Sequence, residues 1–252
     1  MAPDFKDHFS SYASDYAEHR PRYPMALAEF LAETCLRREV AVDCGCGSGQ
    51  LSTLLGDFFD RVIALDASAA QIASATPHPR VEYRVAREVA TGLPGGCADL
   101  IVAAQAAHWF DLPAFFVEAR RIAKSGATVA LVGYGLSTVS QDVDAIIAPF
   151  YHETVGPYWP PERTMVDDAY ASIEFPFNEA PFPKFDMRAD WTLRQFVSYV
   201  STWSAVKAFE KSNGRSPIQD LAGSLELRWG TSDTGREIRW PLFGRVGTVG
   251  YA

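Results

Sequence analysis

The chain has 252 residues, and its content of 48% hydrophobic and 21% charged residues is typical of a globular protein with a sizeable core. Its 31 acidic and 23 basic residues give a net charge of -8, and no run of Lys or Arg stands out. Because nucleic acids bind to basic surfaces, we expect neither DNA nor RNA as a partner. The first 30 residues carry charges without a continuous apolar run, so we expect no signal peptide, no membrane contact and a cytoplasmic protein.

The four cysteines are too irregularly spaced for a disulfide framework or a paired zinc site. They are Cys35, Cys44, Cys46 and Cys97, and a single glycine separates the middle two. We therefore expect no bound metal.

The first half of the chain alternates between predicted helices and short apolar runs. A helix is predicted over 24–38, where Leu27, Phe30 and Leu31 recur at helical spacing after Pro24. The apolar runs are 40–44, 62–66, 81–85, 99–104 and 127–132, and the helical segments between them are 51–59, 68–75 and 112–123. Short apolar runs separated by helices indicate buried parallel strands, which is the pattern of a doubly wound α/β sheet.

The pattern changes after Tyr134, because seven prolines interrupt residues 137–190. This segment cannot be another regular βα unit, and we expect one helix near 141–154 within it. A helix is predicted over 193–208 and another from Pro217 to about residue 228. The tail, 236–251, alternates in a strand-like way and predicts a closing antiparallel strand or hairpin.

We expect one domain over residues 1–252, because the chain has no internal repeat and no low-complexity linker. Its predicted parts are an N-terminal segment at 1–38, a core at 39–135, an inserted aromatic and proline-rich cap at 136–190, and C-terminal helices and closing strands at 191–252. The predicted fold is a Rossmann-like, doubly wound α/β domain with a mostly parallel, seven-stranded sheet.

The most informative stretch, 40–50, runs from an apolar strand through Gly45, Gly47 and Gly49 into a helix. Glycine is needed where a backbone turns sharply or comes close to a ligand, because a Cβ would block the approach. Asp66 ends the next strand, 21 residues after Gly45. A carboxylate at that position can accept hydrogen bonds from both ribose hydroxyls of a nucleotide.

The acid beside this loop indicates the charge of the ligand. Asp43 would repel a pyrophosphate but attract an ammonium or sulfonium group, so we favour a cationic cofactor. The alternative is a nicotinamide-dependent oxidoreductase, for which the loop context and Asp66 fit equally well. That class is expected to show GxGxxG spacing and a Tyr-x-x-x-Lys pair, and neither is present.

The motif Val-Asp-x-Gly-x-Gly-x-Gly over 42–49 resembles the first motif of the class I S-adenosylmethionine-dependent methyltransferases. Segments 9–24, 104–111 and 201–204 are further similar to the trans-aconitate methyltransferase-like branch of that class. The resemblance covers most of the chain, strongly over 9–133 and more loosely beyond.

The resemblance implies a cofactor site for S-adenosylmethionine. Asp43, Gly45, Cys46 and Gly47 would hold its methionine end, Asp66 its ribose, Ala67, Gln71, Arg87 and Glu88 its adenine, and Gln105 would also contact it. Relatives usually carry an acid where Val89 stands, and here Glu88 lies one place earlier. The N-terminal segment would act as a lid, with Tyr16 and Arg20 over the cofactor; the alternative is an ordinary N-terminal helix.

The acceptor should lie outside the carboxyl ends of the fourth and fifth strands, where ligands bind in such sheets. His108, as a general base or a hydrogen-bond donor, Trp109 and Tyr134 are the candidates there. Tyr158, Trp159 and Trp203 are candidates to line an apolar pocket in the cap, with internal packing as the alternative. One of Arg228, Arg239 and Arg245 is a candidate partner for a substrate carboxylate.

The sequence thus predicts an enzyme that transfers a methyl group from S-adenosylmethionine to an oxygen, nitrogen or carbon of a small molecule, including a carboxylate, and releases S-adenosylhomocysteine. We expect a monomer or a homodimer. A non-catalytic relative that keeps the cofactor site is a further alternative.

Overall fold

The computed structural model describes residues 21–231 and 233–250, and an open sheet of eight strands forms its centre. The strands are β1 Val40–Cys44, β2 Arg61–Asp66, β3 Val81–Val85, β4 Ala98–Ala104, β5 Ala123–Tyr134, β6 Asn178–Ala180, β7 Phe185–Trp191 and β8 Arg236–Thr248. Their order is β3-β2-β1-β4-β5-β8-β6, and β7 also pairs with β8. β1 to β5 pair in parallel, whereas β8 runs antiparallel to β5, β6 and β7. The doubly wound, mostly parallel α/β fold is therefore confirmed.

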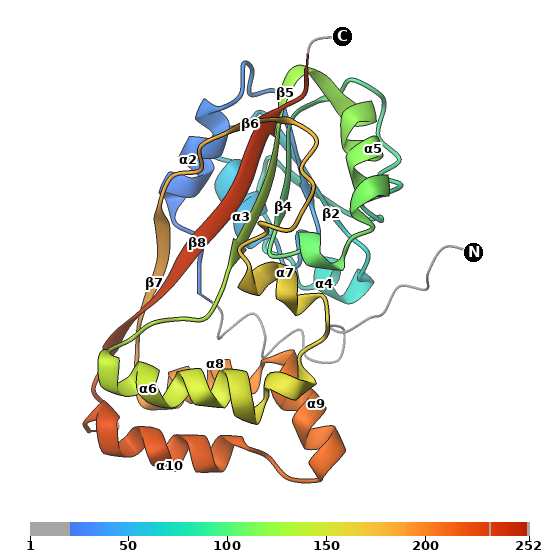
Figure 1. The fold of residues 1–252 in the computed structure, drawn as a ribbon. Helices are drawn as coiled ribbons and strands as arrows, with labels where there is room; N and C mark the ends of the chain where they lie inside the picture. The colour runs from blue at the N-terminus through green and yellow to red at the C-terminus, as the bar shows by residue number, and fades with distance from the viewer. Residues whose placement is uncertain (1–20, 232, 251–252) are drawn as a thin grey trace.

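Helices cover both faces of this sheet (Figure 1). They are α2 Met25–Glu33, α3 Gln50–Leu55, α4 Ala69–Ala73 and α5 Leu112–Ile122. Successive strand residues point to opposite faces, so Leu100 packs in one core with Leu27 and Leu55, while Ile101 packs in a second core with Phe115. β1, β2, β4 and β5 are buried on both faces, which explains why they form continuous apolar runs in the sequence.

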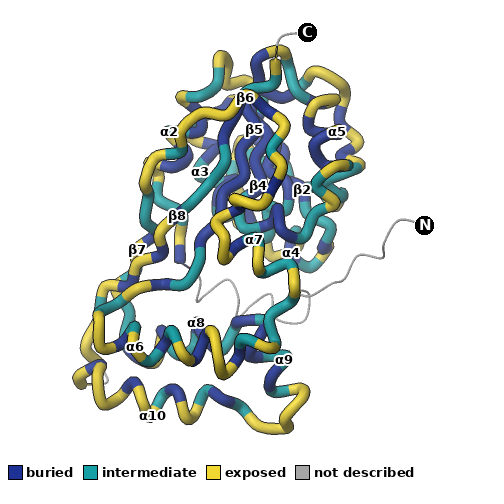
Figure 2. Tube along the Cα trace, in the orientation of Figure 1, coloured by how far each residue is buried: buried dark blue, intermediate teal, exposed yellow. Residues whose placement is uncertain are grey.

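Beyond the sheet lies a layer formed by α6 Gln141–Pro149, α8 Leu193–Ser201, α9 Ser204–Asn213 and α10 Ile218–Trp229, which we call the helical layer (Figure 1). A π-helical turn at Phe150–Thr154, a 3-10 turn at Gly156–Tyr158 and the short α7, Arg163–Asp167, follow α6. The helical layer thus combines elements from the predicted inserted cap, residues 136–190, and from the C-terminal part. Figure 2 shows β4 and β5 buried along most of their length, β7 and β8 only partly buried, and the outer sides of α6 and α10 exposed.

Two details differ from the sequence-based expectation. The sheet has eight strands in the described residues where we expected seven, because both β6 and β7 form within the proline-rich segment. Pro176, Pro181 and Pro183 flank these strands without interrupting them, and β6 and β7 each pair with β8 alone. The helix predicted over 193–208 is divided into α8 and α9, because Trp203 takes an extended backbone conformation (φ -63, ψ 135) and buries its ring.

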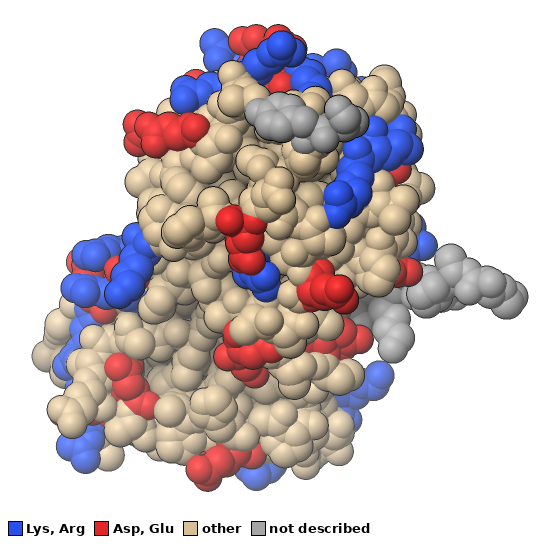
Figure 3. Space-filling model, turned by 45° about the horizontal axis from the view of Figure 1, so that its top comes forward, with Lys and Arg blue, Asp and Glu red and all other residues tan. Residues whose placement is uncertain are grey.

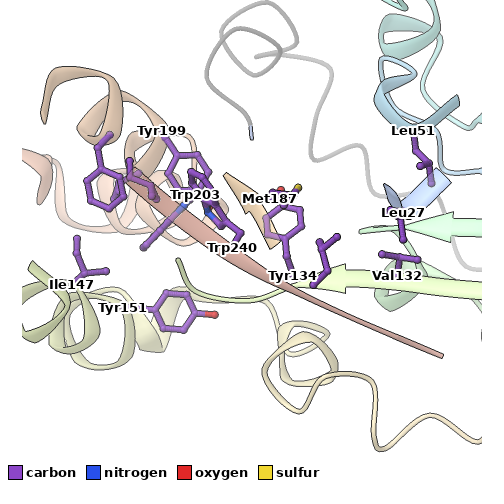
Figure 4. Close-up of a cluster of buried hydrophobic side chains, with 14 of the residues drawn as sticks. Leu27, Leu51, Val132, Tyr134, Ile147, Tyr151, Met187, Tyr199, Trp203 and Trp240 are labelled. Atoms are coloured by element: carbon purple, nitrogen blue, oxygen red, sulfur yellow. The ribbon is translucent and has the colours of Figure 1, made fainter. Parts of the chain in front are cut away.

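The long β8 connects the sheet with the helical layer. Its C-terminal half pairs with β5, and its N-terminal half pairs with β7. Trp240 of β8 donates a hydrogen bond from Nε1 to the Tyr199 hydroxyl of α8 (3.0 Å), within one apolar core that also contains Leu27 and Val132 (Figure 4). No helix of the described residues is both long and apolar enough to cross a membrane.

Candidate active site

A cavity of about 550 Å³ lies at the carboxyl ends of β1, β2, β4 and β5, where ligands bind in open α/β sheets. Its lining includes thirteen of the predicted site residues. They are Asp43, Gly45, Cys46, Gly47, Asp66, Ala67, Gln71, Arg87, Glu88, Gln105, His108, Trp109 and Tyr134. The structure therefore brings the residues predicted for the cofactor and those predicted for the acceptor into one space. We call the residues at the carboxyl ends of β1, β2 and β3, together with the loops after them, the cofactor side. The residues at the carboxyl ends of β4 and β5, together with the segments after them, are the acceptor side.

The glycine loop is held against β2 by its own backbone. The Gly45 and Cys46 amides donate to the Leu65 carbonyl at 2.7 and 3.0 Å. Gly45 has a φ of +72°, and a Cβ built on it would lie 2.6 Å from Cβ of Ala106. Gly49 has a φ of +85°, and its Cβ would overlap the hydroxyl of Tyr83. Side chains at these two positions would collide with Ala106 and Tyr83, which is the physical reason for glycine at both.

The Asp66 carboxylate links the glycine loop to the start of α4. Its Oδ2 accepts a hydrogen bond from the Gly47 amide (2.9 Å), and its Oδ1 accepts one from the Ser68 amide (2.8 Å). Ser68 also caps α4 by accepting from the Gln71 amide. These bonds hold the Asp66 carboxylate in a fixed orientation at the rim of the cavity, beside Ala67 and the buried Gln71.

Asp43 is a buried acid with an incomplete set of partners. Its side chain is 1% exposed, and Oδ2 accepts a hydrogen bond from the Ser52 hydroxyl at 2.6 Å. Oδ1 is buried and has no hydrogen-bond partner among the described residues. Burial raises the pKa of Asp43 to about 7, the Asp66 carboxylate adds to that rise, and the Ser52 hydrogen bond opposes it. A cationic group in the cavity would compensate this buried carboxylate.

The loop after β3 brings Arg87 and Glu88 to the cavity, with Nη2 of Arg87 at 3.8 Å from Oε1 of Glu88. Glu118 of α5 holds this loop in place. Its carboxylate accepts hydrogen bonds from the Thr91 amide at 3.0 Å and from Nε of Arg121 at 2.7 Å. The Arg121 guanidinium and the Thr91 hydrogen bonds lower the pKa of Glu118 to about 2. The Thr91 segment is thus fixed by a carboxylate that stays ionised.

Gln105 connects the ends of β4 and β5. Its side-chain amide donates to the Tyr134 carbonyl (3.1 Å) and accepts from the Tyr134 amide (2.8 Å). Its backbone has a φ of +54°, which is uncommon for a residue with a Cβ. The carboxamide therefore joins the two strand ends that carry the acceptor side.

His108 lies in a 3-10 turn, Ala107–Trp109, that follows β4. It is 5% exposed, and its Nδ1 is 3.1 Å from the hydroxyl of Tyr170. The Trp109 ring lies beside it, with the centroids 4.9 Å apart. Sequence reasoning missed Tyr170, and it also missed Tyr23, Glu162 and Met165, which line the cavity. No local pattern marks these four residues, because folding brings them to the cavity from segments far apart in the chain.

The predicted cap aromatics lie elsewhere, since the lining given by the described residues does not include Tyr158, Trp159 or Trp203. The ring of Tyr151 packs edge to face with that of Trp203 (centroids 5.6 Å apart) and at a tilt against that of Trp159 (5.0 Å). Figure 4 shows Trp203 and Tyr151 within the buried cluster. Tyr158 packs on Phe209 (5.0 Å). This arrangement matches the packing alternative considered for these side chains.

The remaining predicted residues are not part of the described cavity lining. Arg245 pairs with Glu179, Arg239 pairs with Glu237, and Arg228 is exposed. Tyr16 and Arg20 lie outside the described residues. Among the described residues, no group of three or more His, Cys, Asp or Glu side chains is placed to hold a metal ion.

Comparison with known proteins assigns the chain to a family. The family model described as a methyltransferase domain matches residues 42–131, which include the glycine loop and Asp66. A "putative methyltransferase" of Dictyostelium discoideum is 33% identical over 91% of this chain and 89% of its own length. The chain therefore belongs to the class I S-adenosylmethionine-dependent methyltransferases, and it is an enzyme of that class with S-adenosylmethionine as its cofactor.

Two further similarities extend over the whole domain. A "probable S-adenosylmethionine-dependent methyltransferase" of Saccharomyces cerevisiae is 23% identical over 87% of this chain and 93% of its own length. The solved structure of a "putative type II methyltransferase" from Anaeromyxobacter dehalogenans has a TM-score of 0.87 at 44% identity, and the alignment covers 92% of this chain and 99% of that one. These similarities give no support to the nicotinamide-dependent alternative.

Proposed function

We propose that this enzyme methylates a small molecule bound on the acceptor side of the cavity. The observation that carries the proposal is that one cavity of about 550 Å³ joins the glycine loop and Asp66 to His108, Trp109 and Tyr134. This volume lies in the range of small-molecule sites, which is roughly 300–1,000 Å³. On the face shown in Figure 3, Lys and Arg side chains form scattered groups among acidic ones, in keeping with a partner other than a nucleic acid.

The cofactor side fits S-adenosylmethionine by charge and by shape. Oδ1 of Asp43, which has no hydrogen-bond partner among the described residues, suits a cationic group. The glycine loop presents backbone alone at positions 45 and 49, where side chains would collide with Ala106 and Tyr83. When bound, S-adenosylmethionine supplies an electrophilic methyl group on a positively charged sulfur. We assign Asp43, Gly45, Cys46 and Gly47 to its methionine end, Asp66 to its ribose, and Ala67, Gln71, Arg87 and Glu88 to its adenine. Gln105 is a further contact of the cofactor in this assignment, and its hydrogen bonds to Tyr134 also join the ends of β4 and β5.

On the acceptor side, His108, Trp109 and Tyr134 would contact the acceptor. Methyl transfer is an in-line displacement, so these residues act mainly by alignment. A carboxylate gives up no proton when it is methylated, so it needs no base. A carboxylate acceptor agrees with the resemblance to the trans-aconitate methyltransferase-like branch. Of the acids that line the cavity, Asp43, Asp66 and Glu88 lie on the cofactor side, and Asp111 and Glu162 lie on the acceptor side.

Calorimetric titration with S-adenosylhomocysteine tests the cofactor assignment. Asp66→Ala should weaken binding by roughly 1.5–3 kcal/mol, because hydrogen bonds to a charged group are lost. Asp60→Ala is the matched control, since Asp60 is exposed at the opposite end of β2, and it should bind as the parent does. Equal affinity of the Asp66→Ala variant and the parent would overturn the ribose assignment.

An acceptor panel tests the rest of the proposal. Matched carboxylates, phenols and amines are offered with S-adenosylmethionine, and released S-adenosylhomocysteine is quantified. We expect turnover with the small carboxylates and none with the phenols or amines. Turnover confined to amines would overturn the carboxylate assignment while leaving the cofactor site in place. A cytoplasmic location and a monomeric or homodimeric state are further predictions for this protein.

A further inference from the structure

The buried side chain of Tyr170 contacts His108, a candidate residue of the acceptor side. The Tyr170 hydroxyl lies 3.1 Å from Nδ1 of His108. Tyr170 is 0% exposed and is not among the residues that line the cavity, whereas His108 is. The Nδ1 edge of the imidazole therefore points into the protein. Since the two ring nitrogens point in nearly opposite directions, Nε2 lies on the cavity side of the ring.

The turn that carries Tyr170 is held in a strained conformation. Ala169 and Tyr170 have φ values of +57° and +62°, in the left-handed region that residues with a Cβ rarely adopt. Arg245 donates to the carbonyls of Tyr170 (3.1 Å) and Ile173 (3.0 Å), and it is itself paired with Glu179. Strain of this kind is destabilising and tends to persist at functional sites. Here it directs the hydroxyl toward His108.

The direction of this hydrogen bond follows from the surroundings of the hydroxyl. Burial raises the pKa of Tyr170, so its hydroxyl stays protonated. A buried O–H must donate to an acceptor or lose the free energy of a hydrogen bond. Among the described residues, Nδ1 of His108 is the acceptor within reach. If the hydroxyl donates to Nδ1, the neutral imidazole carries its proton on Nε2.

We propose that Tyr170 is a positioning residue that holds His108 as the Nε2-protonated tautomer, with its N–H directed at the acceptor. This inference rests on the proposed function and deepens it. His108 then acts as a hydrogen-bond donor to an acceptor oxygen, and it does not remove a proton from it. The substrate class that fits is an oxygen acid that arrives deprotonated, such as a carboxylate.

The tautomer can be measured on the full-length protein without knowing the acceptor. In ¹⁵N-labelled protein, the nitrogen shifts of a neutral histidine distinguish the protonated from the unprotonated nitrogen. The chain has five histidines, and His108→Gln identifies the His108 signals. We expect a protonated Nε2 and an unprotonated Nδ1. A protonated Nδ1 in the unaltered protein would overturn the inference, whatever the behaviour of any variant.

The variants test the dependence on Tyr170. Tyr170→Phe should convert His108 into a mixture of tautomers. Tyr199→Phe is the matched control, because it also removes one buried hydroxyl, which bonds to Trp240 in the helical layer. His108 signals that change equally in both variants would point to a general structural effect and contradict the assignment.

Binding and turnover separate this inference from the proposed function. S-adenosylhomocysteine should bind Tyr170→Phe within about twofold of the parent, because Tyr170 lies outside the cavity. With an acceptor from the panel, kcat should fall roughly tenfold, as for other groups that orient a functional histidine. Tyr170→Phe should have no further effect on kcat in the His108→Gln background. Additive losses would contradict action through His108. Absence of cofactor binding in the parent would refute the cofactor assignment and would leave the measured tautomer of His108 as it is.

Discussion

The two sides of the cavity are constructed differently. On the cofactor side, short-range features position the groups: a strand end, three glycines and the carboxylate of Asp66, which bonds to the Gly47 and Ser68 amides. On the acceptor side, His108 is held by Tyr170, 62 residues later, and the Tyr170 carbonyl is held by Arg245, a further 75 residues on. A local motif can therefore define cofactor binding, whereas acceptor binding depends on how the segment after α7 packs against the turn after β4 and against β8.

The largest effect should come from damage to the helical layer. Trp203→Ala removes a ring that is 8% exposed and packs against Tyr151 and Tyr199, and it should cost roughly 3–5 kcal/mol in the free energy of unfolding. Urea denaturation measures this loss. Below the transition, affinity for S-adenosylhomocysteine should stay within about twofold of the parent. Trp203→Phe is the control and should lose less stability, because it keeps a ring at that position.

Strong weakening of cofactor binding by Trp203→Ala in folded protein would contradict this division between the two sides. It would indicate that the aromatic cluster of the helical layer contributes to the cofactor site.

Gly45→Ala should disturb the cofactor side. The new Cβ would collide with Ala106 at a φ of +72°, so left-handed strain of roughly 1–2 kcal/mol adds to overpacking of roughly 1–3 kcal/mol. Gly92→Ala is the matched control, because Gly92 has a φ of +69° with no atom within 4 Å of its Cβ position. It should show the strain alone. Urea denaturation and S-adenosylhomocysteine titration should distinguish the two variants, with cofactor binding lost only in Gly45→Ala. Equal losses of stability and of binding in Gly45→Ala and Gly92→Ala would argue against close packing at the glycine loop.

A smaller effect should appear in the pH dependence of Asp43. Its pKa is raised from 3.8 to about 7 in the folded protein, so the stability that its protonated form contributes is lost as pH rises through that window. A cationic ligand favours the carboxylate. Affinity for S-adenosylmethionine should therefore increase roughly tenfold from about pH 6 to about pH 8. Asp43→Asn corrects for titration of the ligand itself, and the same pH dependence in both proteins would exclude Asp43 as the cause.

The sequence predicted the cofactor side well, because its features are local. The apolar runs match β1 to β5 within a few residues, and the glycine loop and Asp66 meet at the predicted edge of the sheet. The strand fixes the position of an acid at its carboxyl end, so that position can be predicted once the strand is recognised.

The acceptor side was predicted only in part. His108, Trp109 and Tyr134 follow strand ends and line the cavity, but Tyr170 and Glu162 could not be found. Aromatic residues among prolines fit a pocket wall and an internal core equally well. The packing of the 3-10 turn Gly156–Tyr158 against α9, about 50 residues later in the chain, decides between them, and no short sequence pattern encodes it.

The length of β8 has a consequence for how the protein loses its structure. One continuous strand pairs with β5 at one end and with β7 at the other, and a single apolar core extends from α2 to the helical layer. Among the described residues, the helical layer shares this core with one face of the sheet, so it has no separate core that would remain intact if the sheet melted. Heating should therefore give one cooperative transition, with near-ultraviolet signals from the tryptophans and far-ultraviolet signals from the backbone changing together.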